Sequence, residues 1–420
     1  MMEYELPTHI KQLEIHAGIK PAGLLTNESH YTYQPYAVGM NISLTMQRKT
    51  LEPFNHGVLH PVFAQNLPEG SNRRYITERL SRYASVDDMY FLALQGDNGI
   101  GMLSYRCGFE FPTVEQISLN DILHYRGDSP LFPQLLEKFY LRNMIAGFQP
   151  KVLLSPDDTL NLSNELERTV VQKDVIVKAS ESDFPLLTIN EYVCMEAARY
   201  CNLDVPKTFL SDNFETFIIE RFDAVDGTAF GYEDFTTLMK KGQDPSAKYS
   251  SSCESLLRAT MLFTDNVKQV EKMYTYIVFN CLIGNGDAHL KNYALQYTPD
   301  MTRVYVSPLY DVTHTQIYAT KFGVIDDMMA LKISKSKTFP DKMRLLALGK
   351  LAGLSNERAL DVIESLGQGI KEYLAISGEV TEFEGLRASI EASVNLGLGS
   401  NYNPKGYVYD RRLKFTPKSM

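Results

Sequence analysis

The spacing of apolar residues predicts a long helix in the second half of the chain, followed by a hairpin. Apolar side chains recur at helical spacing at Val270, Met273, Tyr274, Ile277 and Cys281. A polar run, GNGDAHLKN (284–292), follows this helix at once. Beyond it, YALQY and RVYVSP flank a turn at Pro299 and Asp300, which predicts a β-hairpin.

Upstream, the same reading predicts a strand (VIVKAS), a helix (TINEYVCMEAARYCN) and a second strand (TFIIERFD). Nearer the start, NLPEGSNRRYITERLSRYA predicts a turn at Pro68 to Gly70 and a helix that begins near Ser71 or Asn72. LQGDNGIGMLSYR predicts a helix end, a glycine turn and a strand. A dinucleotide-binding fingerprint needs the strand before the glycines, so we favour a plain turn.

These elements predict an α+β protein in three parts. We expect a mixed α/β region over 1–145, a small strand-rich lobe over 146–245 and a larger, mainly helical lobe over 246–420. The polar stretch 155–174 reads as a loop or a connection between parts.

Composition narrows the class of protein. Of the 420 residues, 44% are hydrophobic and 22% charged, which is ordinary for a globular chain. The net charge of −9 argues against a nucleic-acid coat or an anionic membrane surface as the main partner. The five cysteines show no CxxC pair, and we find neither a secretory signal nor a run of ~20 apolar residues. We therefore expect a cytoplasmic protein with no membrane contact.

The polar run carries the chemistry. Asp287 precedes Asn292 by five positions, and Asp311 follows after the predicted hairpin. Protein kinases place the catalytic aspartate and a metal-binding asparagine at this spacing, and a second metal-binding aspartate comes later. Carboxylate and amide oxygens suit Mg²⁺. The order of these three residues favours a kinase-like phosphotransferase.

A kinase also needs a cation on an earlier strand. Lys178 ends the run VIVK, where a lysine needs a partner, and Glu191 on the next helix is available. An alternative for Glu191 is a capping box in TINE, with Thr188 as N-cap. The segment from Glu220 to Phe222 lies where a kinase linker meets adenine.

Other interpretations stay open. Asp287, His289, Asp311 and His314 together resemble a metal-hydrolase cluster, and Asp287 or Asn292 alone would serve to cap a turn. The stretch NLSNELERTVVQK before Lys178 contains no glycine, unlike the phosphate loop of ordinary protein kinases. Ser163 and Asn164 are the candidates to contact phosphate there.

The chain resembles the HipA-type serine/threonine kinase toxins of type II toxin–antitoxin systems. Six segments carry the resemblance, in the family's order: VFAQNLPEGSNRR, NEYVCMEAARYCNLDVP, IERFD, GNGDAHLKNYAL, SPLYDV and MMALKIS. It implies a two-lobed kinase-like fold closer to that of PI3/4-type lipid kinases, with an extra N-terminal α/β subdomain and a mainly helical C-terminal lobe.

The resemblance also implies ATP and Mg²⁺ as cofactors and a protein hydroxyl as acceptor, known family targets including an aminoacyl-tRNA synthetase. It implies a helix-turn-helix antitoxin partner (HipB-like), through which alone the kinase reaches DNA. Matched residue by residue, the resemblance implies that Lys178 contacts phosphate and that Glu220 and Phe222 belong to the linker beside adenine. It also implies that Asp287 is the catalytic base, with His289 nearby, and that Asn292 and Asp311 are the metal ligands.

The family inactivates itself by phosphorylating a serine of its phosphate loop. Ser163 is the best match in this chain and Ser155 the second, although the family's glycine and glutamine are absent around Ser163. Two alternatives to a protein kinase remain: a kinase for a small molecule, and a catalytically silent kinase fold that serves as a binding module.

Overall fold

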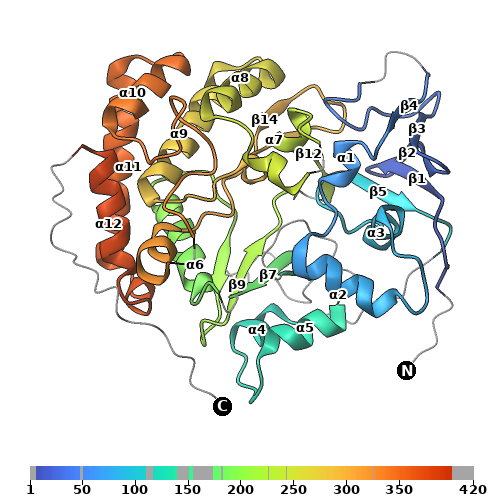
Figure 1. Ribbon diagram of the computed structural model, residues 1–420, viewed down its shortest axis with the longest axis horizontal. Helices are drawn as coiled ribbons and strands as arrows, with labels where there is room; N and C mark the ends of the chain where they lie inside the picture. The colour runs from blue at the N-terminus through green and yellow to red at the C-terminus, as the bar shows by residue number, and fades with distance from the viewer. Residues whose placement is uncertain are drawn as a thin grey trace, which may run out of the picture.

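The computed structural model describes residues 6–47, 51–109, 117–139, 151–154, 174–180, 183–225, 227–242, 244–323 and 325–399. Residues 6–109 form an N-terminal unit built on a five-stranded antiparallel sheet with the order β4-β3-β2-β1-β5. Its strands are β1 (Gln12–Ala17), β2 (Lys20–Asn27), β3 (Tyr31–Pro35), β4 (Phe54–Gly57) and β5 (Leu103–Arg106). Its helices are α1 (Pro61–Ala64), α2 (Gly70–Leu80) and α3 (Asp88–Gln95). The unit lies at one side of the molecule (Figure 1).

The helix predicted in this unit begins earlier than expected. Helix α2 starts at Gly70, and its N-cap is Glu69 rather than Ser71 or Asn72. Glu69 makes no side-chain capping bond, because its carboxylate is bonded to Lys291 instead. The predicted glycine turn is confirmed, since α3 ends at Gln95 and leads through residues 96–102 into β5.

A four-stranded antiparallel sheet, with the order β6-β7-β9-β8, forms the small lobe. Its strands are β6 (Lys151–Leu154), β7 (Val175–Ala179), β8 (Thr208–Leu210) and β9 (Thr216–Glu220). Helices α4 (Leu119–Leu123) and α5 (Leu131–Phe139) contribute to one hydrophobic cluster with Val175, Val177 and Ile218, while α6 (Leu187–Tyr200) belongs to the main core. Because both faces are covered, every residue of β9 is buried.

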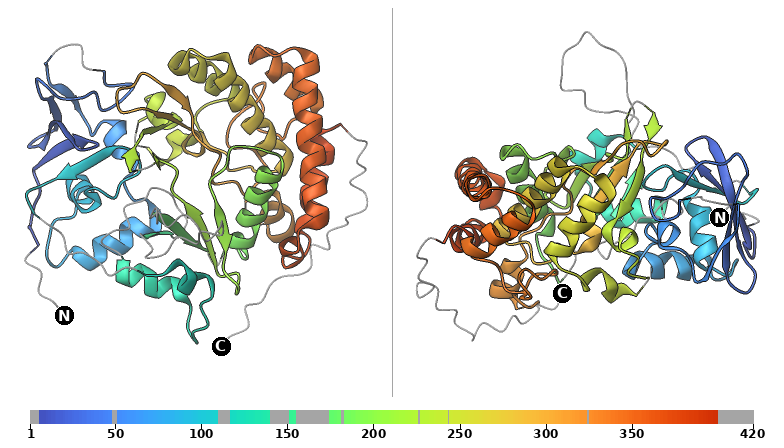
Figure 2. Two further views of the ribbon diagram at one scale, coloured as in Figure 1. Left: turned by 180° about the vertical axis from the view of Figure 1, so that it is seen from behind. Right: turned by 90° about the horizontal axis from the view of Figure 1, so that it is seen from above.

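The rest of the chain is mainly helical, as predicted. Its helices are α7 (Phe235–Leu238), α8 (Cys253–Thr264), α9 (Val267–Ile283), α10 (Lys342–Leu351), α11 (Asn356–Ile376) and α12 (Leu386–Gly397). Single turns lie at Pro245–Tyr249, Leu290–Asn292, Tyr318–Phe322 and Glu379–Thr381. Helices α10, α11 and α12 lie together at the end of the molecule opposite the N-terminal unit (Figures 1 and 2).

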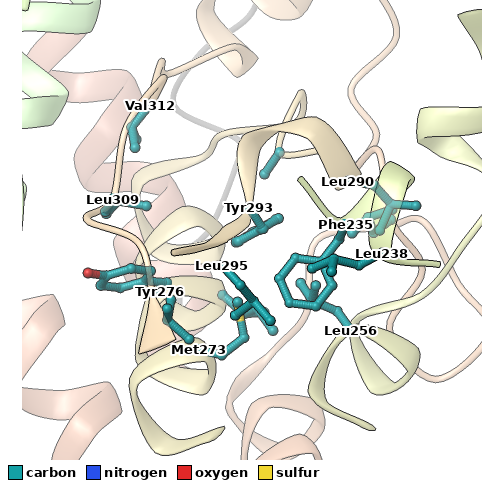
Figure 3. Packing of buried hydrophobic residues seen from close by; sticks show 14 of the residues in the cluster. Phe235, Leu238, Leu256, Met273, Tyr276, Leu290, Tyr293, Leu295, Leu309 and Val312 are labelled. Atoms are coloured by element: carbon teal, nitrogen blue, oxygen red, sulfur yellow. The ribbon is translucent and has the colours of Figure 1, made fainter. Parts of the chain in front are cut away.

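The predicted hairpin is confirmed. Strands β13 (Ala294–Tyr297) and β14 (Val304–Val306) pair antiparallel, and β12 (Gly231–Asp234) adds a third strand beside β13. A short hairpin, β10 (Ala224–Val225) with β11 (Thr228–Ala229), precedes β12. Met273 and Tyr276 of α9 pack with Leu295 of β13 and with residues flanking the polar run (Figure 3). This core fixes the loop between α9 and the hairpin.

Antiparallel sheets separate from the helical layer give the α+β class that was expected. The boundaries of the three predicted parts remain proposals. Within the described ranges, no helix is both long and apolar enough to cross a membrane.

Candidate active site

One cavity of about 760 Å³ lies where the three regions meet. The small lobe lines it with Lys178 and with Glu220 at the end of β9, the linker after β9 with Phe222, and the polar run with Asp287. The N-terminal unit also reaches the cavity, with the residues Gln65, Asn66, Glu69 and Ile100. A volume of this size accommodates a drug-sized ligand.

Lys178 is bonded to two carboxylates at the inner wall of the cavity. Its Nζ lies 2.5 Å from Oε1 of Glu191 and 2.6 Å from Oδ1 of Asp311. The Lys178 side chain is only 6% exposed and that of Glu191 is fully buried. Burial alone would lower the pKa of Lys178, but the charges of Asp311 and Glu191 outweigh it and raise that pKa. The lysine is therefore a fixed cation.

The alternative interpretation of TINE as a capping box is wrong. Helix α6 begins at Leu187, and its N-cap is Leu186 in a left-handed conformation with φ 57°. Thr188 lies inside the first turn, where its hydroxyl donates to the carbonyl oxygen of Phe214 at 2.6 Å. Glu191 consequently does not turn back to an N-cap at Thr188, and its Oε1 accepts from Lys178 instead.

Asn292 and Asp311 form the second polar contact of this wall. The Nδ2 of Asn292 donates to Oδ2 of Asp311 at 3.0 Å. The Oδ1 of Asn292 is buried and accepts no hydrogen bond within the described chain. Asp311 has a left-handed φ of 59°, which strains the backbone and is typical of functional sites. A buried amide oxygen beside a carboxylate suits a hard divalent cation.

The polar residues after α9 form a tight loop that is held by hydrogen bonds from its backbone amides. Gly284 ends α9 with φ 78°, and a Cβ there would come within 2.6 Å of Nδ1 of His314, so glycine is required. Asn285 Oδ1 accepts from the amide of Asp287 at 3.1 Å, and the amide of Gly286 donates to Oγ1 of Thr315 at 2.6 Å. These bonds hold a tight loop that presents Asp287 to the cavity.

The Asp287 carboxylate is solvent-exposed through the cavity, although protein surrounds it closely. Its Oδ1 accepts a hydrogen bond from the hydroxyl of Tyr249 at 3.2 Å. Burial raises the pKa of Asp287 to about 6. The positive charge of Lys248 acts to lower this pKa, and the negative charge of Asp311 acts to raise it further. Water in the open cavity moderates this rise, because hydration stabilises the charged form. A carboxylate with a raised pKa suits proton transfer.

His289 and His314 have different surroundings. Burial lowers the pKa of His289 to about 3, so its imidazole is neutral, and its Nδ1 has no hydrogen-bond partner among the described residues. His314 is turned into the core, where its nitrogens contact the carbonyl of Ile283 and the hydroxyl of Ser389, each at 2.6 Å. His314 therefore does not join Asp311 in a metal-hydrolase cluster, and the described residues hold no group of three potential ligands of that kind.

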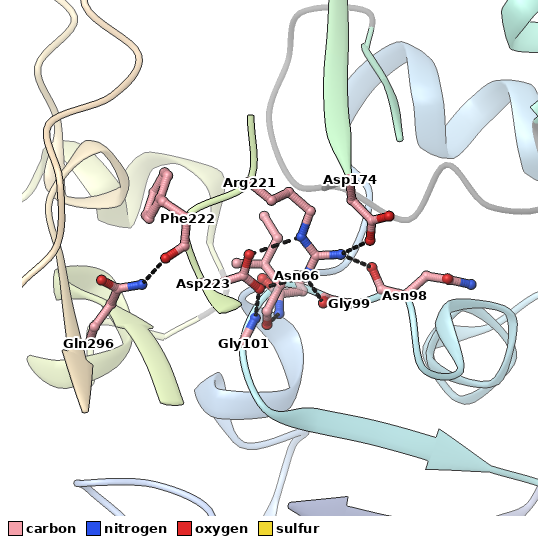
Figure 4. Close-up of polar contacts among 10 residues, drawn as sticks. Asn66, Asn98, Gly99, Gly101, Asp174, Arg221, Phe222, Asp223 and Gln296 are labelled. Atoms are coloured by element: carbon pink, nitrogen blue, oxygen red, sulfur yellow. Dashed lines mark hydrogen bonds and ion pairs between the residues drawn. The ribbon is translucent and has the colours of Figure 1, made fainter. Parts of the chain in front are cut away.

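The linker after β9 is anchored to the N-terminal unit (Figure 4). Arg221 forms two hydrogen bonds with Asp223, at 2.9 and 2.5 Å, and donates to the carbonyls of Asn98 and Gly99. The amide of Gly101 donates to Asp223 at 2.6 Å. The glycine turn of the N-terminal unit thus fixes the linker rather than a dinucleotide.

Two predicted linker residues have distinct environments. Glu220 is the buried last residue of β9. The carbonyl of Phe222 accepts from Nε2 of Gln296 at 2.9 Å, and its ring lies 5.4 Å from that of Tyr310, a neighbour that the sequence did not reveal. Ser163 and Ser155 lie outside the described residues, as does Asn164.

The sequence reading missed the part that the N-terminal unit plays in this cavity. Glu69 Oε1 lies 2.5 Å from Nζ of Lys291 in the polar run, and Gln65 bonds both Tyr232 and Asp234 of β12. The segment NLPEG was recognised as a turn with family likeness. The partner of its Glu69, Lys291, lies 222 positions away and therefore leaves no local signal in the sequence.

Two protein-family models match this chain. The model of the HipA-like C-terminal domain matches residues 143–373, more than half of the chain, and that of the HipA N-terminal domain matches residues 13–106. Two Sinorhizobium fredii proteins whose names describe them as kinases are similar. Y4dM is 26% identical, with 77% of each chain covered, and Y4mE is 29% identical, with 78% of this chain and 81% of the relative covered.

The fold resembles that of a solved Shewanella oneidensis structure, a HipA, HipB and operator DNA complex of a toxin–antitoxin system. The TM-score is 0.64 and the identity 20%, with 92% of this chain and 97% of the other covered. The expected kinase-like α+β fold is thereby confirmed.

Proposed function

From the premise that this chain belongs to the HipA-like kinase family, we propose that it is an ATP- and Mg²⁺-dependent kinase that phosphorylates a serine or threonine hydroxyl of a protein. The proposal rests on one observation: hydrogen bonds link four side chains at the cavity, and Asp287 lines the same cavity. The four are Lys178, Glu191, Asp311 and Asn292. Phosphoryl transfer needs this combination of a fixed cation, oxygen ligands for a metal and a carboxylate.

Each residue has a proposed role. Asp287 orients the acceptor hydroxyl and takes its proton, and neutral His289 lines the cavity beside it. Lys178, held by Glu191, binds phosphate oxygens. Asp311 and the Oδ1 of Asn292, which accepts no hydrogen bond from the described residues, would hold Mg²⁺, and the bound ion would neutralise phosphate charge.

The linker and its aromatic neighbours would bind the adenine base of ATP. Glu220 and Phe222 line the cavity, and the rings of Phe222, Tyr232 and Tyr310 form a cluster at 5.4 to 6.5 Å between centroids. Adenine packs favourably on such apolar surface. We place the adenine edge against Glu220 and the ring face near Phe222.

The physiological setting is part of the proposal. We infer a cytoplasmic toxin with a helix-turn-helix antitoxin partner, which alone contacts DNA, and a protein target such as an aminoacyl-tRNA synthetase. Autophosphorylation at Ser163, or at Ser155 as second choice, is proposed on family likeness. The solved relative with HipB and operator DNA supports the antitoxin.

A labelling experiment tests the activity. The wild-type protein, given labelled ATP and Mg²⁺ in a bacterial lysate, is expected to transfer phosphate to a protein. Asp287→Asn should slow transfer by roughly a hundredfold or more, because it cannot accept the proton, yet keep the ATP-dependent rise in melting temperature.

Other outcomes would overturn the proposal in distinct ways. Label found only on small molecules would indicate a small-molecule kinase. A rise in melting temperature with ATP but no transfer to any acceptor would indicate a silent binding module.

A further inference from the structure

The cations that line the cavity divide into two groups. Three are held by carboxylates: Lys178 by Glu191 and Asp311, Arg221 by Asp223, and Lys291 by Glu69. The other two, Lys248 and Lys337, form no ion pair with a described carboxylate and line the same cavity. Among the described residues, no carboxylate is therefore paired with these two positive charges, which face the site.

The polar run itself supplies no free cation beside Asp287. His289 is neutral, because burial lowers its pKa to about 3, and the ammonium of Lys291 is bonded to Glu69 at 2.5 Å. Phosphoryl transfer spreads negative charge over the oxygens of the transferring group, and fixed positive charge stabilises it. A cation from another element would meet this requirement.

Lys248 lies on such an element, the single turn Pro245–Tyr249, which Asp244 caps through the amide of Ser246. The next residue, Tyr249, donates to Asp287 at 3.2 Å, and its ring packs edge-on against the imidazole of His289 at 5.4 Å. The Nζ of Lys248 lies 5.3 Å from the centre of that ring.

The electrostatic effect of Lys248 supports this location. Its charge is the main influence that opposes the raised pKa of Asp287, and it also contributes to the lowered pKa of His289. Lys337 is not among the main influences on the pKa of either group. Since the adjacent Tyr249 contacts both Asp287 and His289, Lys248 is the one of these two cations that lies beside the proposed reacting centre.

We propose that Lys248 is a catalytic residue that binds the transferring γ-phosphoryl group, a role that rests on the proposed kinase activity. The acceptor oxygen forms a bond to the γ-phosphorus as the bond to the β–γ bridging oxygen breaks. The bridging electron pair leaves with ADP, and the acceptor proton passes to Asp287. Lys248 stays protonated and donates hydrogen bonds to the γ-phosphoryl oxygens as the group moves from ADP to the acceptor, in the transition state.

The test compares Lys248→Met with Lys248→Arg and with Lys240→Met, a control at an exposed lysine outside the cavity lining. We expect Lys248→Met to lower kcat by roughly a hundredfold, as for loss of one preorganised donor to a transition state. Its Kd for ATP with Mg²⁺ should stay within about threefold of wild type, since a contact made in the transition state adds little to ground-state binding. Lys248→Arg should restore part of kcat, and Lys240→Met should match wild type.

A second readout does not need turnover. Lys248→Met should lose most of its affinity for ADP with Mg²⁺ and aluminium fluoride, which imitates the transferring group, but bind ADP with Mg²⁺ normally. Equal loss for both ligands, or wild-type kcat in Lys248→Met, would overturn the role of Lys248 while the kinase stands. If wild type and Lys240→Met transfer no phosphate, the proposed function fails and this role fails with it.

Discussion

At the level of single residues, Lys178 combines a structural role in ion pairs with the phosphate-binding role that we propose. Its ammonium bonds the buried Glu191 and the more exposed Asp311 at once, at 2.5 and 2.6 Å. The sequence allowed the pairing with Glu191 to be predicted, because a strand lysine needs a partner and the next helix offered one. It did not indicate the direct bond to Asp311, which depends on how two distant segments meet.

The two roles of Lys178 can be separated by a double substitution that removes the charges of Lys178 and Glu191 together. Lys178→Met alone would leave Glu191 buried without its counter-ion and destabilise the lobe by about 3–5 kcal/mol. The double variant Lys178→Met/Glu191→Gln removes both charges. We expect it to bind ATP at least tenfold more weakly, because charge-assisted bonds to phosphate are lost, and adenosine about as well as wild type.

Calorimetric titration with ATP and adenosine measures both affinities. A similar loss for the two ligands would show that the lobe has changed shape and that Lys178 does not select phosphate.

At the level of elements, local patterns predicted the helices and the hairpin well and their capping poorly. The apolar spacing of Val270 to Cys281 predicted α9, which is buried along those positions. Thr188 and Ser71 had the side chains of N-caps, but α6 begins after Leu186 and α2 begins after Glu69. Tertiary bonds to Phe214 and Lys291 decided these helix starts, and such bonds have no local signature.

The ion pair of Glu69 with Lys291 joins α2 to the loop that carries Asp287 and Asn292. Glu69→Lys and Lys291→Glu should each lower kcat by roughly tenfold, because a small displacement of a catalytic loop is costly to the rate. The exchanged double variant should recover much of that loss, since the pair is restored with opposite polarity. Steady-state kinetics gives all four values.

Glu78→Lys is the matched control, because Glu78 lies exposed on the same helix. If the exchanged variant is as slow as the product of the two single losses, the ion pair does not position the loop.

At the level of the whole molecule, the N-terminal unit completes the cavity through contacts that the sequence could not show. The hydroxyl of Ser43 donates a hydrogen bond to the carboxylate of Glu233 at 2.8 Å, although the two residues are 190 positions apart. The amide of Leu44 and the hydroxyl of Tyr297 also donate to Glu233, at 2.7 and 2.8 Å. One buried carboxylate thus joins the N-terminal unit to the sheet of β12 and β13.

This joint predicts a pH-dependent stability. Burial raises the pKa of Glu233 from its ordinary 4.5 to about 7, although the bonds from Leu44, Tyr297 and Ser43 act against the rise. The folded protein therefore holds a proton that the unfolded chain has lost between pH 4.5 and 7. The resulting stability is fully present below about pH 4.5 and is lost as the pH rises through 7, with a slope of up to ~1.4 kcal/mol per pH unit.

Glu233→Gln has no such proton to lose, and its amide oxygen still accepts from Leu44 and Tyr297. We therefore expect the melting temperature of the variant, relative to wild type, to rise between pH 5 and pH 8. Glu215→Gln, at an exposed carboxylate in the turn before β9, should show a constant difference over that range. Melting curves at half-unit pH steps measure both. A difference for Glu233→Gln that does not change with pH would mean that Glu233 keeps its charge on folding, and that its three hydrogen bonds compensate for its burial.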